Sequence, residues 1–219
     1  MDPRPSPLHG QLASVNVGLP QVLIDDQGRQ WTTAIRKLPV QGRVAIRGVN
    51  LDGDDQADRR VHGGPDKAVY AYAAEDYAWW SAGLECVLTP GSIGENLTVE
   101  GLRVTGAVVG ERWRVGTALL EVCQPRVPCA KLGVAMGDAH FPREFAEAGR
   151  PGAYLRILEP GEVGTGDDVL VIEVPDHGLT VGDVARAFHV RDDVGAARML
   201  KVPALAAKWH AWASERLGR

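Results

Sequence analysis

Short runs rich in β-branched and aromatic residues, separated by glycine and proline, fill the first three quarters of this 219-residue chain. Such runs are typical of β-strands. An open sheet of many short strands would expose unpaired edges, which closure into a barrel removes. The sequence therefore predicts a mainly β fold, a closed β-barrel, with strands at residues 12–17, 31–35, 43–49, 67–72, 97–99, 117–123, 153–158 and 169–174.

Hydrophobic residues recur at helical spacing after residue 175. The first helix of this tail is predicted to start at Thr180, because the side chain of Asp183 can reach back to the backbone of this capping residue. A second helix, capped by Asp192 or Asp193, is predicted to reach residue 200. The third is predicted to open at Pro203 and to place on one side Leu205, Trp209 and Trp212.

These patterns predict a β-barrel domain over residues 1–175 and a three-helix subdomain over residues 176–219. Two short helices are expected within the barrel, one at residues 75–81 and one starting at Pro142, since proline suits the first helical turn. The tail is too short to support an independent core. We therefore expect it to pack on the barrel or on a partner.

The charge balance excludes some classes of partner. The chain carries 24 Lys and Arg against 28 Asp and Glu, a net charge of −4, which argues against broad attraction to nucleic acid or to an anionic membrane. The N-terminus has no signal-peptide-like apolar run, and no eighteen apolar residues follow one another. We therefore expect a cytoplasmic protein that does not bind membranes.

The cysteines indicate thiol chemistry rather than disulfides. Cys86, Cys123 and Cys129 form no CxxC pair, and their odd number argues against a disulfide framework in a reducing compartment. The cysteines and six histidines also lack the paired spacing of a structural zinc site. A thiol can therefore stay free.

Cys129 is the strongest candidate for a reactive thiol. It lies in Gln124-Pro125-Arg126-Val127-Pro128-Cys129-Ala130-Lys131-Leu132, just after a predicted strand. Two prolines stiffen this loop, and two cations favour the thiolate, which attacks electrophiles or binds soft metals. The alternative is a buried structural cysteine in a proline-rich turn, because free cysteines are among the most buried residues.

Two glycine-containing segments could accompany this cysteine. In the first segment, a Gly-Gly-Pro turn separates His62 from Lys67. His62 can exchange protons near neutral pH, and Lys67 can hold an anion. The glycines around Gly94 could turn amides toward an anion, although this segment lacks the ending of a P-loop. Taken alone, each segment is more often a purely structural turn.

Together, and in this order, these segments resemble the MOSC domain family, named for the C-terminal domain of molybdenum cofactor sulfurase, in its bacterial YiiM-like branch. The resemblance covers nearly the whole chain, including the three-helix tail. The residues that carry it are Val61-His62-Gly63-Gly64-Pro65-Asp66-Lys67-Ala68-Val69, Gly94-Glu95-Asn96-Leu97-Thr98, Gln124-Pro125-Arg126 with Pro128-Cys129 and Lys131-Leu132, and the stretch from Gly152 to Gly161.

The resemblance implies a barrel that binds a molybdopterin-type molybdenum cofactor and reduces N-hydroxylated compounds, such as N-hydroxylated purines. By position in the motifs, Cys129 is the expected molybdenum ligand, His62 the proton donor, and Lys67 a positive charge that holds cofactor or substrate. The expected cofactor-binding residues are Cys129, Lys67, Arg126, Arg156, Gly94 and Asn96. Arg156 could equally be a solvated strand residue.

Some alternatives stay open at this point. Cys123 stands where the family more often has serine or threonine, and is either a harmless inward thiol or a second sulfur near the site. A sulfur-transfer protein carrying a persulfide on Cys129 is the second candidate function, and a non-catalytic small-molecule-binding barrel is the third. A reductase would need a separate electron-donor protein, because the chain has no flavin or iron–sulfur motif. The tail could also serve a homodimer contact.

Overall fold

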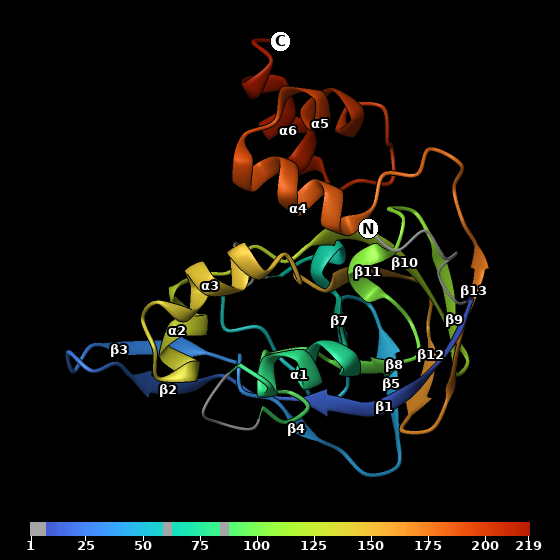
Figure 1. Ribbon diagram of the computed structural model, residues 1–219. Helices are drawn as coiled ribbons and strands as arrows, with labels where there is room; N and C mark the ends of the chain where they lie inside the picture. Colours follow the sequence, from blue (N-terminus) through green and yellow to red (C-terminus); the bar gives the residue numbers. More distant parts are fainter. Residues whose placement is uncertain (1–7, 59–62, 84–87) are drawn as a thin grey trace.

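A closed β-barrel forms the body of the molecule in the computed structural model, which describes residues 8–58, 63–83 and 88–219 (Figure 1). The strands follow one another in the order β13-β9-β10-β11-β7-β8-β1, and β1 also pairs with β13, which closes the ring. Among the described residues, the barrel strands are β1 (His9–Val17), β7 (Val69–Ala73), β8 (Leu97–Glu100), β9 (Arg112–Val115), β10 (Ala118–Pro125), β11 (Ala153–Glu159) and β13 (Asp168–Glu173). The predicted mainly β barrel is confirmed.

All neighbouring barrel strands are antiparallel except β7 and β8, which pair in parallel. Outside the ring, β2 (Gln21–Ile24) and β3 (Gln30–Thr33) form a hairpin. A small sheet contains β5 (Arg43–Arg47), β6 (Asn50–Leu51) and β12 (Gly161–Gly164). Strand β4 (Leu38–Pro39) pairs with the end of β1. Each of the eight predicted runs overlaps an observed strand. The prediction that Lys67 lies in a strand was wrong, because Lys67 ends the 3₁₀ turn Pro65–Lys67.

Strand β9 belongs to the ring but was missed by the sequence reasoning. Its sequence is short and carries two arginines, which made it unlike a hydrophobic strand. In the structure Trp113 and Val115 are buried in the barrel. Arg112 makes an ion pair at 2.9 Å with Glu173 of the adjacent β13, and Arg114 makes one at 2.7 Å with Glu159 at the end of β11.

Three short helices border the barrel: α1 (Ala74–Ser81), α2 (Ala130–Met136) and α3 (Phe141–Ala148). The predicted helices at residues 75–81 and at Pro142 are confirmed, whereas α2 was not predicted. An aromatic cluster fills the space between α1, α3 and β7, with Trp80 stacked on Phe145 at 6.0 Å and Tyr72 stacked on the same ring at 6.1 Å.

The tail forms three helices, α4 (Val181–Val190), α5 (Asp193–Met199) and α6 (Ala207–Arg216), which lie together on one side of the barrel (Figure 1). Thr180 and Asp183 cap α4 reciprocally, and Asp192 caps α5, as predicted. The prediction that Pro203 opens the third helix was wrong. Residues 201–206 instead form turns that fasten to the barrel, where the Ala206 amide donates to the Cys123 carbonyl at 3.2 Å.

The tail and the barrel share one hydrophobic core. Buried residues of the helices, such as Val184 and Trp209, belong to the same contiguous cluster as barrel residues such as Leu120 and Val122. The tail therefore packs on the barrel, while the domain boundary at residue 175 stays a prediction. In the described part of the chain, no helix combines the length and apolar character needed to cross a bilayer.

Candidate functional site

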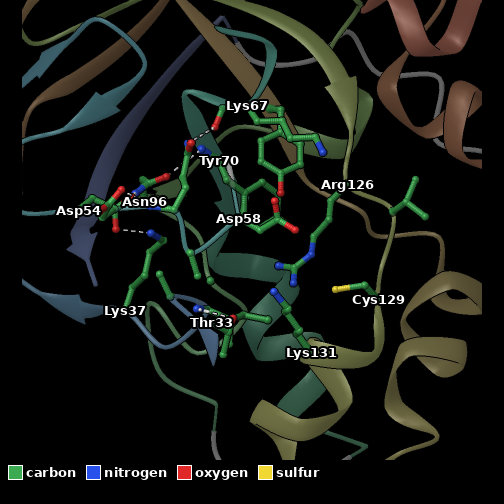
Figure 2. Close-up of a pocket in the computed structure, with 18 residues that line it drawn as sticks. Thr33, Lys37, Asp54, Asp58, Lys67, Tyr70, Asn96, Arg126, Cys129 and Lys131 are labelled. Carbon is green, nitrogen blue, oxygen red and sulfur yellow. Dashed lines mark hydrogen bonds and ion pairs between the residues drawn. The ribbon is translucent and has the colours of Figure 1, made fainter. Parts of the chain in front are cut away.

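A pocket lies where β10 gives way to α2, and we call it the cysteine pocket (Figure 2). Its volume is about 100 Å³. Loops after β3 and β6, the start of β7 and the loop before β8 form its other walls. Its charged lining residues are Lys37, Asp54, Asp55, Asp58, Lys67, Arg126 and Lys131, and its remaining described lining includes Tyr70, Gly94, Asn96, Cys129 and Tyr154.

Cys129 is half-buried and lines this pocket. Pro125 ends β10, and Cys129 then adopts an extended conformation directly before α2, so the chain turns at the cysteine. Figure 2 shows its sulfur pointing toward the side chains of Arg126 and Lys131. The alternative of a structural cysteine sealed in the core does not describe this residue.

Arg126 supplies a fixed positive charge beside the sulfur. Its guanidinium is buried, donates to the Ile93 carbonyl and lies 5.2 Å from the centre of the Tyr70 ring. Burial works against its charge, but the proximity of Tyr70, Tyr154 and Cys129 outweighs it and raises the pKa of Arg126. The group therefore stays a cation whose position is set by packing.

Lys67 lies at the end of the 3₁₀ turn that Gly64 introduces with a φ of 91°, a value that glycine adopts readily. Partial burial lowers the pKa of Lys67, and the negative charges of Cys129, Asp58 and Asp66 oppose that shift. Lys67 and Cys129 both line the pocket. The structure thus brings Lys67, Arg126 and Cys129 to one pocket.

Gly94 and Asn96 line the same pocket, but their amides face inward. The Gly94 amide donates to the Gly91 carbonyl at 2.9 Å, and the Asn96 amide donates to the Tyr70 carbonyl at 2.8 Å. The prediction that these amides turn toward an anion is therefore wrong. The Asn96 side chain instead joins neighbouring segments, since it accepts from the Tyr70 amide at 3.1 Å and donates to Asp54 at 2.9 Å.

Arg156 does not line the cysteine pocket. Its guanidinium donates to Asp66 at 2.6 Å, to Glu121 at 2.9 Å and to the Ala204 carbonyl at 2.7 Å. Two carboxylates neutralise this arginine, and it fastens β11 to the tail. These contacts correct the prediction that Arg156 binds the cofactor, and also the alternative that it is simply solvated.

Cys123 is an inward thiol rather than a second sulfur of the site. It is buried and contacts the carbonyl oxygens of Asp66 and Tyr154 at 3.2 and 3.3 Å. Burial raises the pKa of this thiol well above its ordinary value. His62, the predicted proton donor, lies outside the described residues, and its role stays a prediction.

Sequence reasoning missed the ion pair between Lys37 and Asp54, which forms part of the pocket wall. Burial lowers the pKa of Lys37, while Asp54 acts in the opposite direction. No motif links these residues, which come from the loops after β3 and β6. The acidic stretch Asp52 to Asp55 was the one available signal, and on its own it indicates only a polar turn.

Comparisons with known proteins identify the family of the chain. A family model described as "MOSC domain" matches residues 58–170. YflK of Bacillus subtilis is 37% identical over 200 residues, which cover 90% of each chain, and YiiM of Escherichia coli is 34% identical over 184 residues, or 81% of each. A Gibberella moniliformis protein named "Reductase" is 30% identical over 198 residues, covering 88% of this chain and 34% of that one.

Among solved structures, YiiM from Geobacillus stearothermophilus superposes with a TM-score of 0.78 at 30% identity, covering 95% of this chain and 99% of the other. The match therefore extends over the barrel and the helical tail. The family model includes Lys67, Arg126, Cys129 and Asn96, four of the residues that line the cysteine pocket. The chain belongs to the MOSC domain family, in its YiiM-like branch.

Proposed function

We propose that the protein is a molybdenum-cofactor-dependent reductase of N-hydroxylated compounds, including N-hydroxylated purine bases. The observation that carries this proposal is the half-buried sulfur of Cys129 in a pocket shared with Lys67, Arg126 and Lys131. The membership of the MOSC family supports the link to the cofactor, and the fungal relative's printed name, "Reductase", supports the reaction type.

The donor set of the cysteine pocket fits such a cofactor. A thiolate is a suitable ligand for a soft metal, and Cys129 is the one cysteine among the described lining residues. A pterin cofactor carries a phosphate, and Arg126, Lys67 and Lys131 supply positive charge in the same pocket. The bound molybdenum centre would supply two-electron and oxygen-atom chemistry, while the protein would supply ligation, orientation and charge.

The proposed reaction breaks the N–O bond of the substrate, forms an N–H bond and releases the oxygen as water. Two electrons come from a separate donor protein, and two protons must reach the nitrogen and the departing oxygen. We assign proton donation to His62. Lys67, whose pKa is lowered by partial burial, is a second group that can pass a proton within the pocket.

Metal analysis tests the ligand assignment. The protein and its Cys129→Ala and Cys123→Ala variants are purified from a host that makes the cofactor, and molybdenum and pterin are measured per chain. We expect both in the wild type and in Cys123→Ala, with loss of molybdenum in Cys129→Ala. Equal molybdenum in all three would contradict the assignment of Cys129.

A second measurement addresses the reaction itself. The loaded protein is mixed with 6-hydroxylaminopurine and a chemical reductant, and adenine formation is followed. No turnover by fully loaded protein would overturn the reductase proposal. A stoichiometric sulfane sulfur on Cys129 in metal-free protein would support the sulfur-transfer alternative instead.

A further inference from the structure

A second cavity lies between the barrel and the C-terminal helices, and we call it the tail cavity. Its volume is about 620 Å³. Helices α4 and α6 provide one wall with Phe188, Lys208, Trp209 and Trp212, and the segment from Gln124 to Cys129 contributes to the opposite one. The motifs of the cysteine pocket assign no role to these tail residues.

The tail cavity and the cysteine pocket meet at a shared wall. Lys67, Val127, Cys129 and Tyr154 line both spaces. Cys129 is thus approached from two sides, from the charged pocket inside the barrel mouth and from the cavity under the tail. A molecule held in the tail cavity would therefore lie beside the segment that carries this sulfur.

The tail wall is an aromatic corner held in place by the barrel. Trp209 is buried, and its indole donates to the Gln124 side chain at 3.1 Å. Phe188 packs edge-on against Trp209 and Trp212, with ring centres 5.2 and 5.3 Å apart. Phe188 is 37% exposed and Trp212 half-buried, so both present ring surface to the cavity rather than closing into the core.

Lys208 adds a hydrogen-bond donor to this corner. Its ammonium lies 4.9 Å from the centre of the Trp209 ring, and Lys208 lines the cavity together with Lys67 and Asp66 of the barrel. Loss of solvent contact at the ammonium, together with the charge of Lys67, lowers the pKa of Lys208 to about 8. A donor beside flat apolar rings is suited to a ligand with a planar ring and acceptor atoms at its edge.

We propose that the tail cavity is the substrate site, in which a flat heteroaromatic N-hydroxylated compound lies against Phe188 and Trp212 with acceptor atoms directed to Lys208. This inference rests on the proposed function and extends it. It gives the tail helices a role in substrate recognition, and it separates the residues that hold the substrate from those that hold the cofactor. The N–O group of a ligand so placed faces the Cys129 side of the cavity.

Direct binding tests the proposal without requiring catalysis. The full-length protein is titrated with 6-hydroxylaminopurine and with adenine by calorimetry, in the absence of reductant. Trp212→Leu should weaken binding about tenfold, because the base would lose a stacking partner. Lys208→Gln, which keeps a polar side chain but removes the charge, should weaken it several-fold. Trp79→Leu, an exposed tryptophan of α1, is the matched control and should bind like the wild type.

The outcomes separate this inference from the proposed function. Weaker base binding by Trp212→Leu and Lys208→Gln, with molybdenum content unchanged, would support the substrate site whether or not turnover is found. Absence of binding by the wild type, or equal binding by all variants, would overturn it even if the protein is a reductase. In steady-state assays the same variants should raise KM more than they lower kcat.

Discussion

The indole nitrogen of Trp209 lies 3.1 Å from the side-chain oxygen of Gln124, so the last helix is hydrogen-bonded to the strand that leads to Cys129. Gln124 in turn donates to the Asp66 carbonyl at 2.6 Å, next to Lys67. One amide side chain therefore fixes the tail, the 3₁₀ turn and the cysteine segment relative to one another. The geometry of the site depends on the tail being docked.

Replacing Gln124 should destabilise the protein. Gln124→Leu removes both bonds and leaves the buried Trp209 N–H and the Asp66 carbonyl without these partners, and each such loss costs about 1–3 kcal/mol. We expect the free energy of unfolding, measured by urea denaturation, to fall by about 2 kcal/mol. Gln11→Leu, at an exposed position of β1, is the control and should stay within about 0.5 kcal/mol of the wild type. A wild-type value for Gln124→Leu would show that the tail is held by packing alone.

The two described cysteines should differ in reactivity. Cys129 is half-buried in an open pocket, whereas Cys123 is buried and its thiol pKa is raised by that burial. Because the thiolate is the reactive form, iodoacetamide at pH 8 should alkylate Cys129 at least about tenfold faster than Cys123 in the native protein. Peptide mass spectrometry at timed intervals reads each site separately. The denatured protein is the control, in which both cysteines should react at similar rates. Similar alkylation rates in the native protein as well would contradict the placement of Cys129.

A buried carboxyl beneath the pocket should be sensitive to its hydroxyl partner. Glu95 is buried and accepts from Tyr77 at 2.7 Å, from Thr98 at 2.8 Å and from the Gly91 amide at 2.7 Å. Burial raises the pKa of Glu95, and these donors limit the rise. Tyr77→Phe should therefore lower the free energy of unfolding by about 1–3 kcal/mol and raise the pKa of Glu95 further.

The pH dependence of that loss follows from the sign of the shift. When the pKa of a carboxyl is raised by folding, the free energy of unfolding falls as the pH rises from the pKa of the unfolded chain, 4.5, through the pKa of the folded protein. The Tyr77→Phe defect should therefore be smaller at pH 4 than at pH 7, as measured by urea unfolding at both. A defect of equal size at both pH values would indicate lost packing rather than a lost partner for the carboxylate.

The sequence predicted the local parts of the site and missed the parts that closure of the barrel brings together. Cys129 and Lys67 were found because each lies in a stiff turn with its own local motif. The role predicted for Arg156 was wrong because its partners, Asp66 and Glu121, are distant in the sequence and become neighbours only through strand pairing. The Lys37–Asp54 pair was missed for the same reason.

The tail illustrates the same limit. Helical spacing and capping residues identified three helices, but Pro203 misplaced the start of the third, because contacts with β10 hold residues 201–206 in turns. The sequence also placed Leu205, Trp209 and Trp212 on one helical side without indicating what they face. Trp209 faces the barrel, whereas Trp212 is left at the cavity wall, a distinction that only the packed structure provides.

The stability of the protein should also respond to the titration of Lys208. Its pKa is lowered to about 8, from 10.5, by loss of solvent contact and by the charge of Lys67, with Asp66 and Cys123 acting in the opposite direction. Between these two values the unfolded chain keeps the proton and the folded chain has lost it, so this group makes stability rise with pH across that window. Part of the residue stays in contact with solvent, so the effect should be below that of a fully buried lysine. Lys208→Met should remove this rise. The free energy of unfolding of both proteins is measured with urea at pH 7.5 and pH 10, and the wild type should gain stability relative to the variant at the higher pH. A difference between the two proteins that does not change with pH would contradict the shifted pKa.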